Sequence, residues 1–184
     1  NVYIDPTCLA TSIIPSVIEE YHKETSGYLI GSNGSRASRL RIVSAYPIQT
    51  DHKNPTWVEH GNVSAVERLD SVMKTMNVKL VGGFHSHPEG PNKLSRSDID
   101  FVSEKLEEHS LPSWLELIVS VKRKEYRSKQ EVGWLVKSHI KKLGLTIKTS
   151  PFAGFDVTLS GFWILNPERK VREARLWTSQ RYNF

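Results

Sequence analysis

Two histidines separated by a single residue are the part of this sequence best suited to metal chemistry. They are His85 and His87, in the segment GGFHSHPEGPNKLSRSDID at residues 82–100. Side chains alternate between the two faces of a β-strand, so both imidazoles point the same way if this segment is extended. They would supply two nitrogen ligands, and a catalytic zinc site needs one more protein ligand and an open position.

Asp98 is the candidate for the third ligand. It lies eleven residues after His87, beyond a loop that contains Gly90, and in the first turn of an expected helix. Such a loop can fold back and bring the helix start over the end of the strand. The same residues also match a capping box, in which Ser95 and Asp98 stabilise the helix start without any metal. The two roles are compatible, because a helix that Ser95 begins could also aim Asp98 at a metal.

Glu24 is the candidate for a general base. A metal-bound water needs a group that accepts its proton and passes it to the leaving group. Glu24 comes just before an expected strand with glycines at positions 27 and 31. Taken by itself, a glutamate at this place is best explained as an exposed charge at the end of a helix.

Hydrophobic patterns predict the elements that must position these residues. Helices are expected over residues 6–24, with a kink near Pro15, and over residues 61–77 and 95–109. Strands are expected at residues 25–32, 39–49, 79–87, 114–123, 143–150, 155–161, 162–167 and 173–179. This mixture of helices and strands around one sheet predicts a layered α/β (α+β) domain.

Taken together, these segments resemble the JAMM (MPN+) metalloprotease family. The family pattern begins with a glutamate in E-x-x-G-x-L-x-G, which residues 24–31 match, and continues with H-x-H-P-x6-S-x-x-D, which residues 85–98 match. The resemblance covers roughly residues 2–122. Gly83 and Phe84 stand where proteasomal members usually carry Trp and Tyr, and the EGPNKL loop is similar to the prokaryotic branch. We therefore interpret the chain as similar to an archaeal-type homologue of the proteasomal-lid deubiquitinase.

The resemblance implies a role for each candidate residue. His85, His87 and Asp98 would bind Zn2+ with a water in the fourth position, Glu24 would be the general acid/base, and Ser95 would hold the water and stabilise the oxyanion.

It also implies the MPN fold, a curved and mainly antiparallel sheet flanked by helices. Residues 1–125 would form the catalytic core, and residues 126–184 an extension packed on it.

The activity that the resemblance implies is zinc-dependent cleavage after the C-terminal Gly-Gly of ubiquitin or a ubiquitin-like modifier, with a proteasome-related assembly as a further partner. Processing of a sulfur-carrier protein's C-terminus stays open as an alternative. So does a DNA-associated role, since one repair-linked family carries a similar His-x-His-Pro run. A non-catalytic MPN scaffold is disfavoured, because this chain has every ligand position.

Charge and composition add weaker expectations. Residues 1–120 hold 11 Lys+Arg against 15 Asp+Glu, a net of −4, and residues 121–184 hold 14 against 5, a net of +9. The basic part could meet nucleic acid or an acidic protein, but a solvated charged face explains it equally well, and nucleic acid is not the expected partner. Cys8 is the single cysteine, and we find no signal peptide and no apolar run of about 18 residues. We expect a soluble cytoplasmic protein with no membrane contact.

Overall fold

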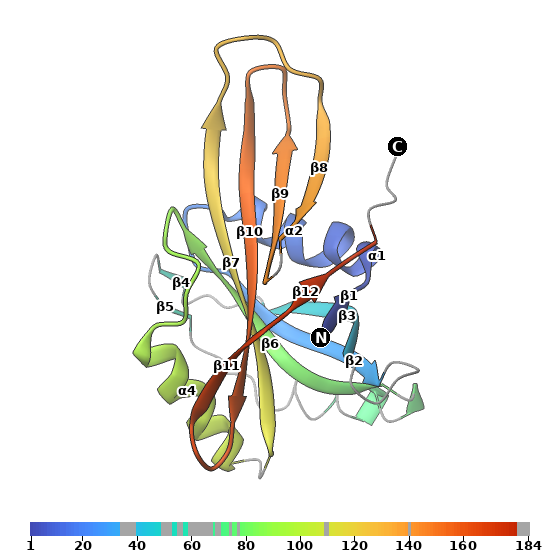
Figure 1. The fold of residues 1–184 in the computed structure, drawn as a ribbon, viewed down its shortest axis with the longest axis vertical. Helices are drawn as coiled ribbons and strands as arrows, with labels where there is room; N and C mark the ends of the chain where they lie inside the picture. Colours follow the sequence, from blue (N-terminus) through green and yellow to red (C-terminus); the bar gives the residue numbers. More distant parts are fainter. Residues whose placement is uncertain are drawn as a thin grey trace.

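A curled, ten-stranded mixed sheet organises this computed structural model (Figure 1). The structure describes residues 1–33, 40–48, 53–54, 57–58, 68, 71–73, 75–76, 78–108, 111–139 and 141–179. The strands of the sheet are β1 (Val2–Ile4), β2 (Ser26–Asn33), β3 (Leu40–Ile48), β6 (Lys79–Pro88), β7 (Ser113–Glu125), β8 (Gly133–Ser138), β9 (Lys142–Lys148), β10 (Ala153–Leu165), β11 (Lys170–Ala174) and β12 (Leu176–Trp177). A separate two-stranded sheet pairs β4 (Lys53–Asn54) with β5 (Trp57–Val58).

The strand order is β12-β1-β3-β2-β6-β7-β10-β9-β8, with β11 paired to β10. Three pairs are parallel, β1 with β3, β1 with β12, and β6 with β7, and the other described pairs are antiparallel. The predicted α+β class, with a curved and mainly antiparallel sheet flanked by helices, is therefore confirmed.

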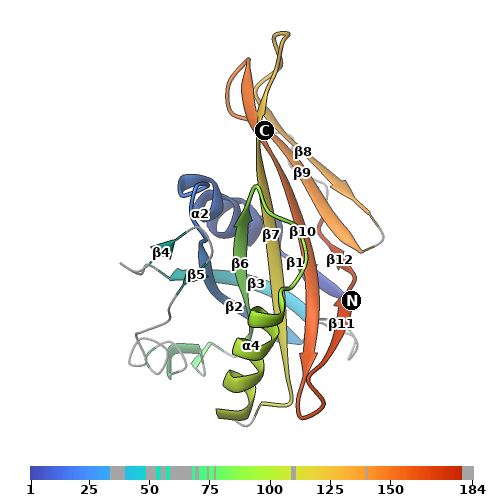
Figure 2. The same ribbon diagram turned by 90° about the vertical axis from the view of Figure 1, so that its left-hand side faces the viewer.

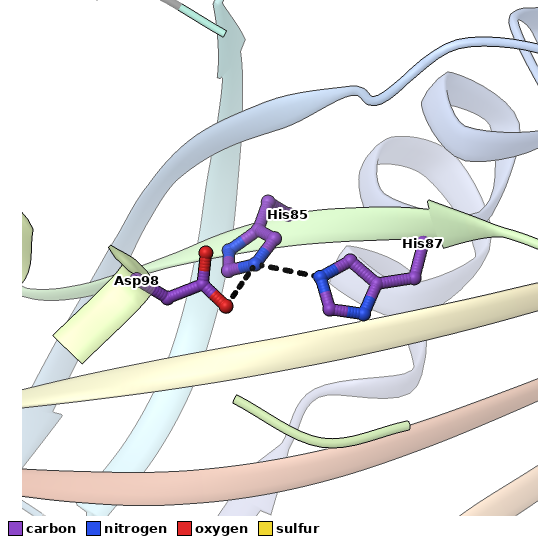
Figure 3. A group of neighbouring side chains, drawn as sticks. All are labelled: His85, His87 and Asp98. Atoms are coloured by element: carbon purple, nitrogen blue, oxygen red, sulfur yellow. Dashed lines mark hydrogen bonds and ion pairs between the residues drawn. The ribbon is translucent and has the colours of Figure 1, made fainter. Parts of the chain in front are cut away.

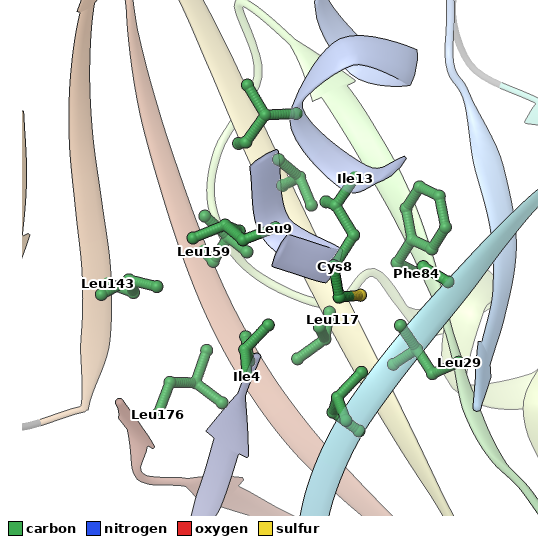
Figure 4. Close-up of a cluster of buried hydrophobic side chains, with 14 of the residues drawn as sticks. Ile4, Cys8, Leu9, Ile13, Leu29, Phe84, Leu117, Leu143, Leu159 and Leu176 are labelled. Atoms are coloured by element: carbon green, nitrogen blue, oxygen red, sulfur yellow. The ribbon is translucent and has the colours of Figure 1, made fainter. Parts of the chain in front are cut away.

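One face of the sheet packs on the N-terminal helical segment. This segment runs through α1 (Pro6–Cys8), the π-helical turn η1 (Leu9–Ile13) and α2 (Ile14–Glu19) without a break. The kink expected near Pro15 takes the form of a change in helix type, because the π-helical turn ends at Ile13 and α2 begins at Ile14. Proline has no N–H to donate within a helix, which favours such an irregularity. Figure 4 shows the core that results, in which side chains such as Leu9, Ile13, Phe84 and Leu117 are buried together.

The opposite face of the sheet is covered at one end by α4 (Arg96–Glu108) (Figure 2). Its Val102 and Leu106 form a smaller core with Trp114 of β7 and Ile164 of β10. The sheet thus has a buried face on the α1–α2 side and a second face that α4 covers in part. The helix expected over residues 61–77 lies largely outside the described residues.

The last third of the chain contributes strands to the same sheet as the rest of the chain. The strand β10 is a single element, where the pattern predicted two strands meeting near Gly161. A Cβ at this position would come within 2.8 Å of a Leu176 methyl and 3.1 Å of the Ala174 Cβ, so Gly161 marks a close approach and not a break. The boundary predicted at residue 125 coincides with the end of β7, and it stays a prediction, since the ladder continues from β7 to β10. Strands β7 to β10 extend together beyond the rest of the sheet (top of Figure 1).

No helix in the described part of the chain combines the length and apolar character that a membrane span requires.

Candidate metal centre

Strand β6 presents both histidines on the face of the sheet that α4 partly covers. The Nε2 atoms of His85 and His87 lie 3.1 Å apart, and both rings point toward the start of α4 (Figure 3). Phe84 belongs to the core on the other face, as the alternation of side chains along a strand requires. The expectation that the two imidazoles share one side is therefore met.

Asp98, in the first turn of α4, completes a three-residue cluster. Its Oδ2 lies 3.5 Å from Nε2 of His85, and one ligand atom from each of the three residues falls within 4.8 Å of the others. Metal–ligand bonds of about 2.0–2.1 Å in a tetrahedron separate the ligand atoms by about 3.3 Å. The spacing of these donors fits a metal ion of that size, and two imidazoles with one carboxylate leave a fourth position for water or substrate.

The outer nitrogen of each ring is engaged, so that the inner nitrogens face the cluster. The Nδ1 of His85 lies 2.7 Å from Glu116 Oε1, and the Nδ1 of His87 lies 2.7 Å from the carbonyl oxygen of Pro91. A carbonyl and a carboxylate both accept, so Nδ1 carries a proton in each ring, and Nε2 is the atom left to bind a metal. Outer partners of this kind orient histidine ligands in metal sites.

Glu116 is a further candidate site residue, which the sequence patterns did not identify. It is only 5% exposed on β7, and its second oxygen accepts from Nε1 of Trp114 at 2.7 Å. The hydrophobic pattern predicts only a strand over residues 114–123 and assigns Glu116 no role. The lone carboxylate of this strand was the available signal, because an ionisable group is rarely buried without a partner.

Replacing Glu116 with glutamine should weaken zinc binding by about 10- to 100-fold, since the amide holds the His85 ring less firmly than the carboxylate. Zinc affinity is measured by competition with a chromogenic chelator. Glu125→Gln, on the same strand but 80% exposed, is the matched control and should bind zinc like the unaltered protein. Equal affinity in all three proteins would exclude an orienting role for Glu116.

The helix start holds Asp98 in place. The N–H of Asp98 donates to Ser95 Oγ at 3.1 Å, and the N–H of Ser95 donates to Asp98 Oδ2 at 2.6 Å. The capping box is therefore present, and the same Oδ2 faces His85. Burial raises the pKa of Asp98, but the hydrogen bonds and charge of His85 and the contacts with Ser95 outweigh it, so this pKa lies well below its usual range. Ser95 Oγ also lies 2.8 Å from Ser97 Oγ.

The loop between the ligands is fixed to β7. The N–H of Glu89 donates to the carbonyl of Val121 at 2.9 Å, and its Oε1 accepts from the N–H of Arg123 at 2.9 Å. The carbonyl of Gly90 accepts from Ser120 Oγ at 2.7 Å. These contacts hold the chain that connects His87 to α4.

Glu24 lies half-buried just before β2, in the electrostatic range of the cluster. Ser26, two residues later, pairs with His85 across the β2–β6 ladder. Burial raises the pKa of Glu24 to about 7, the charge of His85 lowers it, and that of Asp98 raises it. A carboxylate with a pKa near neutrality suits a group that must both accept and return a proton.

Zinc binding should release a proton from the His85 ring. Burial lowers the pKa of His85, but hydrogen bonds and charges from Asp98 and Glu116 outweigh it and raise the pKa to about 10. The metal-free ring is therefore protonated at pH 7, and a metal must displace that proton from Nε2. We expect about one proton released per zinc and an affinity that rises with pH between pH 6 and 8. Calorimetric titrations in two buffers of different ionisation enthalpy measure this, and a buffer-independent heat would contradict it.

Comparison with known proteins agrees with this arrangement. The sequence model of the family described as prokaryotic homologs of the JAB domain matches residues 7–132, a span that includes every candidate site residue. Among solved structures, the solution structure of a protein from Desulfitobacterium hafniense is similar, with a TM-score of 0.54 and 18% sequence identity, covering 100% of this chain and 96% of that one. At that identity the likeness concerns the fold alone. Among curated proteins the comparison found no significant match.

Proposed function

Because the chain belongs to the family of prokaryotic homologs of the JAB domain, we propose that it is a zinc-dependent isopeptidase or peptidase. Its substrate would be the peptide or isopeptide bond after the C-terminal Gly-Gly of ubiquitin or a ubiquitin-like modifier. The observation that carries this proposal is the convergence of His85, His87 and Asp98 around one point beside a carboxylate of raised pKa.

In this proposal His85, His87 and Asp98 hold the ion. Zinc, when bound, polarises the scissile carbonyl and lowers the pKa of its water to about 7. Glu24 takes a proton from the attacking water and returns it to the departing amine, which for an isopeptide is a lysine side chain. Ser95, beside the cluster at the start of α4, directs its hydroxyl at the developing oxyanion. Removing one such donor costs on the order of a hundredfold in rate.

Cleavage of defined fusions tests the proposal. A ubiquitin-like protein ending in Gly-Gly is joined either head-to-tail to a fluorescent reporter or to a lysine side chain of it. We expect cleavage after the second glycine, lost on chelation and restored by zinc, because the water requires the ion to become a nucleophile at neutral pH. Chelator-resistant cleavage, or no cleavage of any fusion by the zinc-loaded protein, would overturn the proposal.

Two classes of substrate fit this chemistry, ubiquitin-like modifiers and sulfur-carrier proteins, and comparing cleavage of the two distinguishes them. A sulfur-carrier protein has its own Gly-Gly terminus, so the same assay run with a sulfur-carrier fusion and a ubiquitin-like fusion compares them directly. A higher kcat/KM for the sulfur-carrier fusion would assign the chain to C-terminal processing.

We further propose a cytoplasmic site of action, which cell fractionation tests. We also propose association with a proteasome-related assembly, which is tested by asking whether that assembly co-purifies with the zinc-loaded chain.

Binding to DNA is a second candidate function, favoured only by the basic last third of the chain. Lys122 and Lys124 at the end of β7 and Lys137 on β8 are exposed on the part of the sheet that extends outward. Retention of duplex DNA at physiological ionic strength, weakening steeply with added salt, would support this function. Absence of binding under those conditions would remove it.

A further inference from the structure

Ser86 lies between the two histidines on β6 and takes no part in the chemistry described above. Its neighbours on either side turn to the metal face, so the serine turns to the opposite face of the sheet. There its side chain is enclosed, and the residue is 1% exposed.

Two hydrogen bonds join Ser86 to the residue that follows Glu24. The N–H of Ser86 donates to the carbonyl of Thr25 at 2.7 Å, and Ser86 Oγ accepts from the N–H of Thr25 at 2.8 Å. Thr25 is 2% exposed, so both bonds are shielded from water. Buried hydrogen bonds of this kind are costly to break, because the donor that loses its partner stays without water.

The second of these bonds departs from ordinary strand pairing. Opposed residues in an antiparallel ladder exchange bonds between backbone groups, so the N–H of Thr25 would usually donate to a backbone carbonyl. Here the serine hydroxyl accepts it, one residue outside β2, where the chain leaves the sheet toward Glu24. The side chain at position 86 therefore determines how the backbone next to the glutamate is held.

We propose that Ser86 is a positioning residue for Glu24, an inference that rests on the proposed function. The three consecutive residues 85–87 then serve both halves of the site, since the histidines bind the metal and the serine between them fixes the backbone that carries the base. Proton transfer requires the base within about 2.6–3.2 Å of its partner, and a displacement of about 1 Å can cost about a hundredfold in rate.

The test removes the hydroxyl alone. In zinc-loaded Ser86→Ala, we expect kcat on the ubiquitin-like fusion to fall by roughly ten- to a hundredfold, with KM and zinc affinity changed less than about twofold. The amide of Thr25 should exchange with solvent faster in the variant, a readout that needs no activity. Ser86→Thr keeps the hydroxyl and should recover most of the lost rate.

Ser160→Ala is the matched control. Ser160 is also a buried serine in the same sheet, 4% exposed, but its Oγ has no hydrogen-bond partner among the described residues. We expect it to keep the unaltered kcat, which separates the loss of the Thr25 contact from the loss of any buried hydroxyl.

A double-mutant comparison decides whether the serine acts through the glutamate. Ser86→Ala added to Glu24→Gln should lower the residual rate no further, because the group that the serine positions is already gone. Three results would overturn this inference alone: a further ten- to hundredfold loss in the Glu24→Gln background, a fall in zinc affinity as large as the fall in kcat, or an unchanged kcat in Ser86→Ala. Failure of the unaltered protein on every fusion would instead overturn the proposed function, and the inference with it.

Discussion

Replacing His87 with alanine is expected to abolish stoichiometric zinc binding and, with it, cleavage of every Gly-Gly fusion. His87 Nε2 lies 3.1 Å from the facing nitrogen of His85, so its loss leaves one nitrogen and one carboxylate oxygen in the cluster. Removing a residue that only orients a metal ligand lowers metal affinity by about 10- to 100-fold. Removing the ligand itself should therefore lower zinc affinity by more than about a hundredfold. Metal content after dialysis, measured by elemental analysis, reports the binding.

His139→Ala is the control for this variant. His139 is exposed just after β8, away from the cluster, and its removal should leave both zinc content and activity unchanged. The ligand assignment would be wrong if His87→Ala retained one zinc per chain with unaltered affinity.

Replacing Glu24 with glutamine is expected to lower kcat by about a hundred- to ten-thousandfold, the range for a lost general acid–base. Glutamine has the same shape but cannot accept a proton, so the fold and the zinc content should persist. The raised pKa of Glu24, about 7, also predicts that kcat/KM of the unaltered protein rises as pH increases toward neutrality, because only the carboxylate accepts a proton. Initial rates across pH, with zinc content checked at each point, measure both effects.

Glu19→Gln provides the comparison, since Glu19 is an exposed residue at the end of α2 and should keep the unaltered rate. A zinc-loaded Glu24→Gln protein with undiminished cleavage would remove Glu24 from the mechanism and leave the metal centre intact.

The ligand set could be predicted from the sequence because its geometry is local. Alternation along one strand places His85 and His87 on the same face, and a short loop with a capping box constrains Asp98 to the start of the next helix. Glu24 is 61 residues before His85, so only the resemblance to a known pattern connected them.

Other features depend on contacts that no local pattern reveals. Glu116 was hidden in an apolar strand because its partners, His85 and Trp114, are recognisable only once β6 and β7 lie side by side. The pairing of β1 with β12 joins residues 2–3 to residues 176–177, and β1 itself is too short to leave a periodic signal. Alternation along β6 is enough to predict that Ser86 faces away from the metal, but its bond to Thr25 is a consequence of the β2–β6 register.

Anomalous X-ray diffraction at the zinc edge, from crystals grown with zinc, tests the metal centre most directly. We predict one strong peak about 2.0–2.2 Å from Nε2 of His85, Nε2 of His87 and a carboxylate oxygen of Asp98, with the fourth position open to solvent. A zinc-replete crystal with no peak between these three side chains, or with the ion held by other residues, would contradict the assignment.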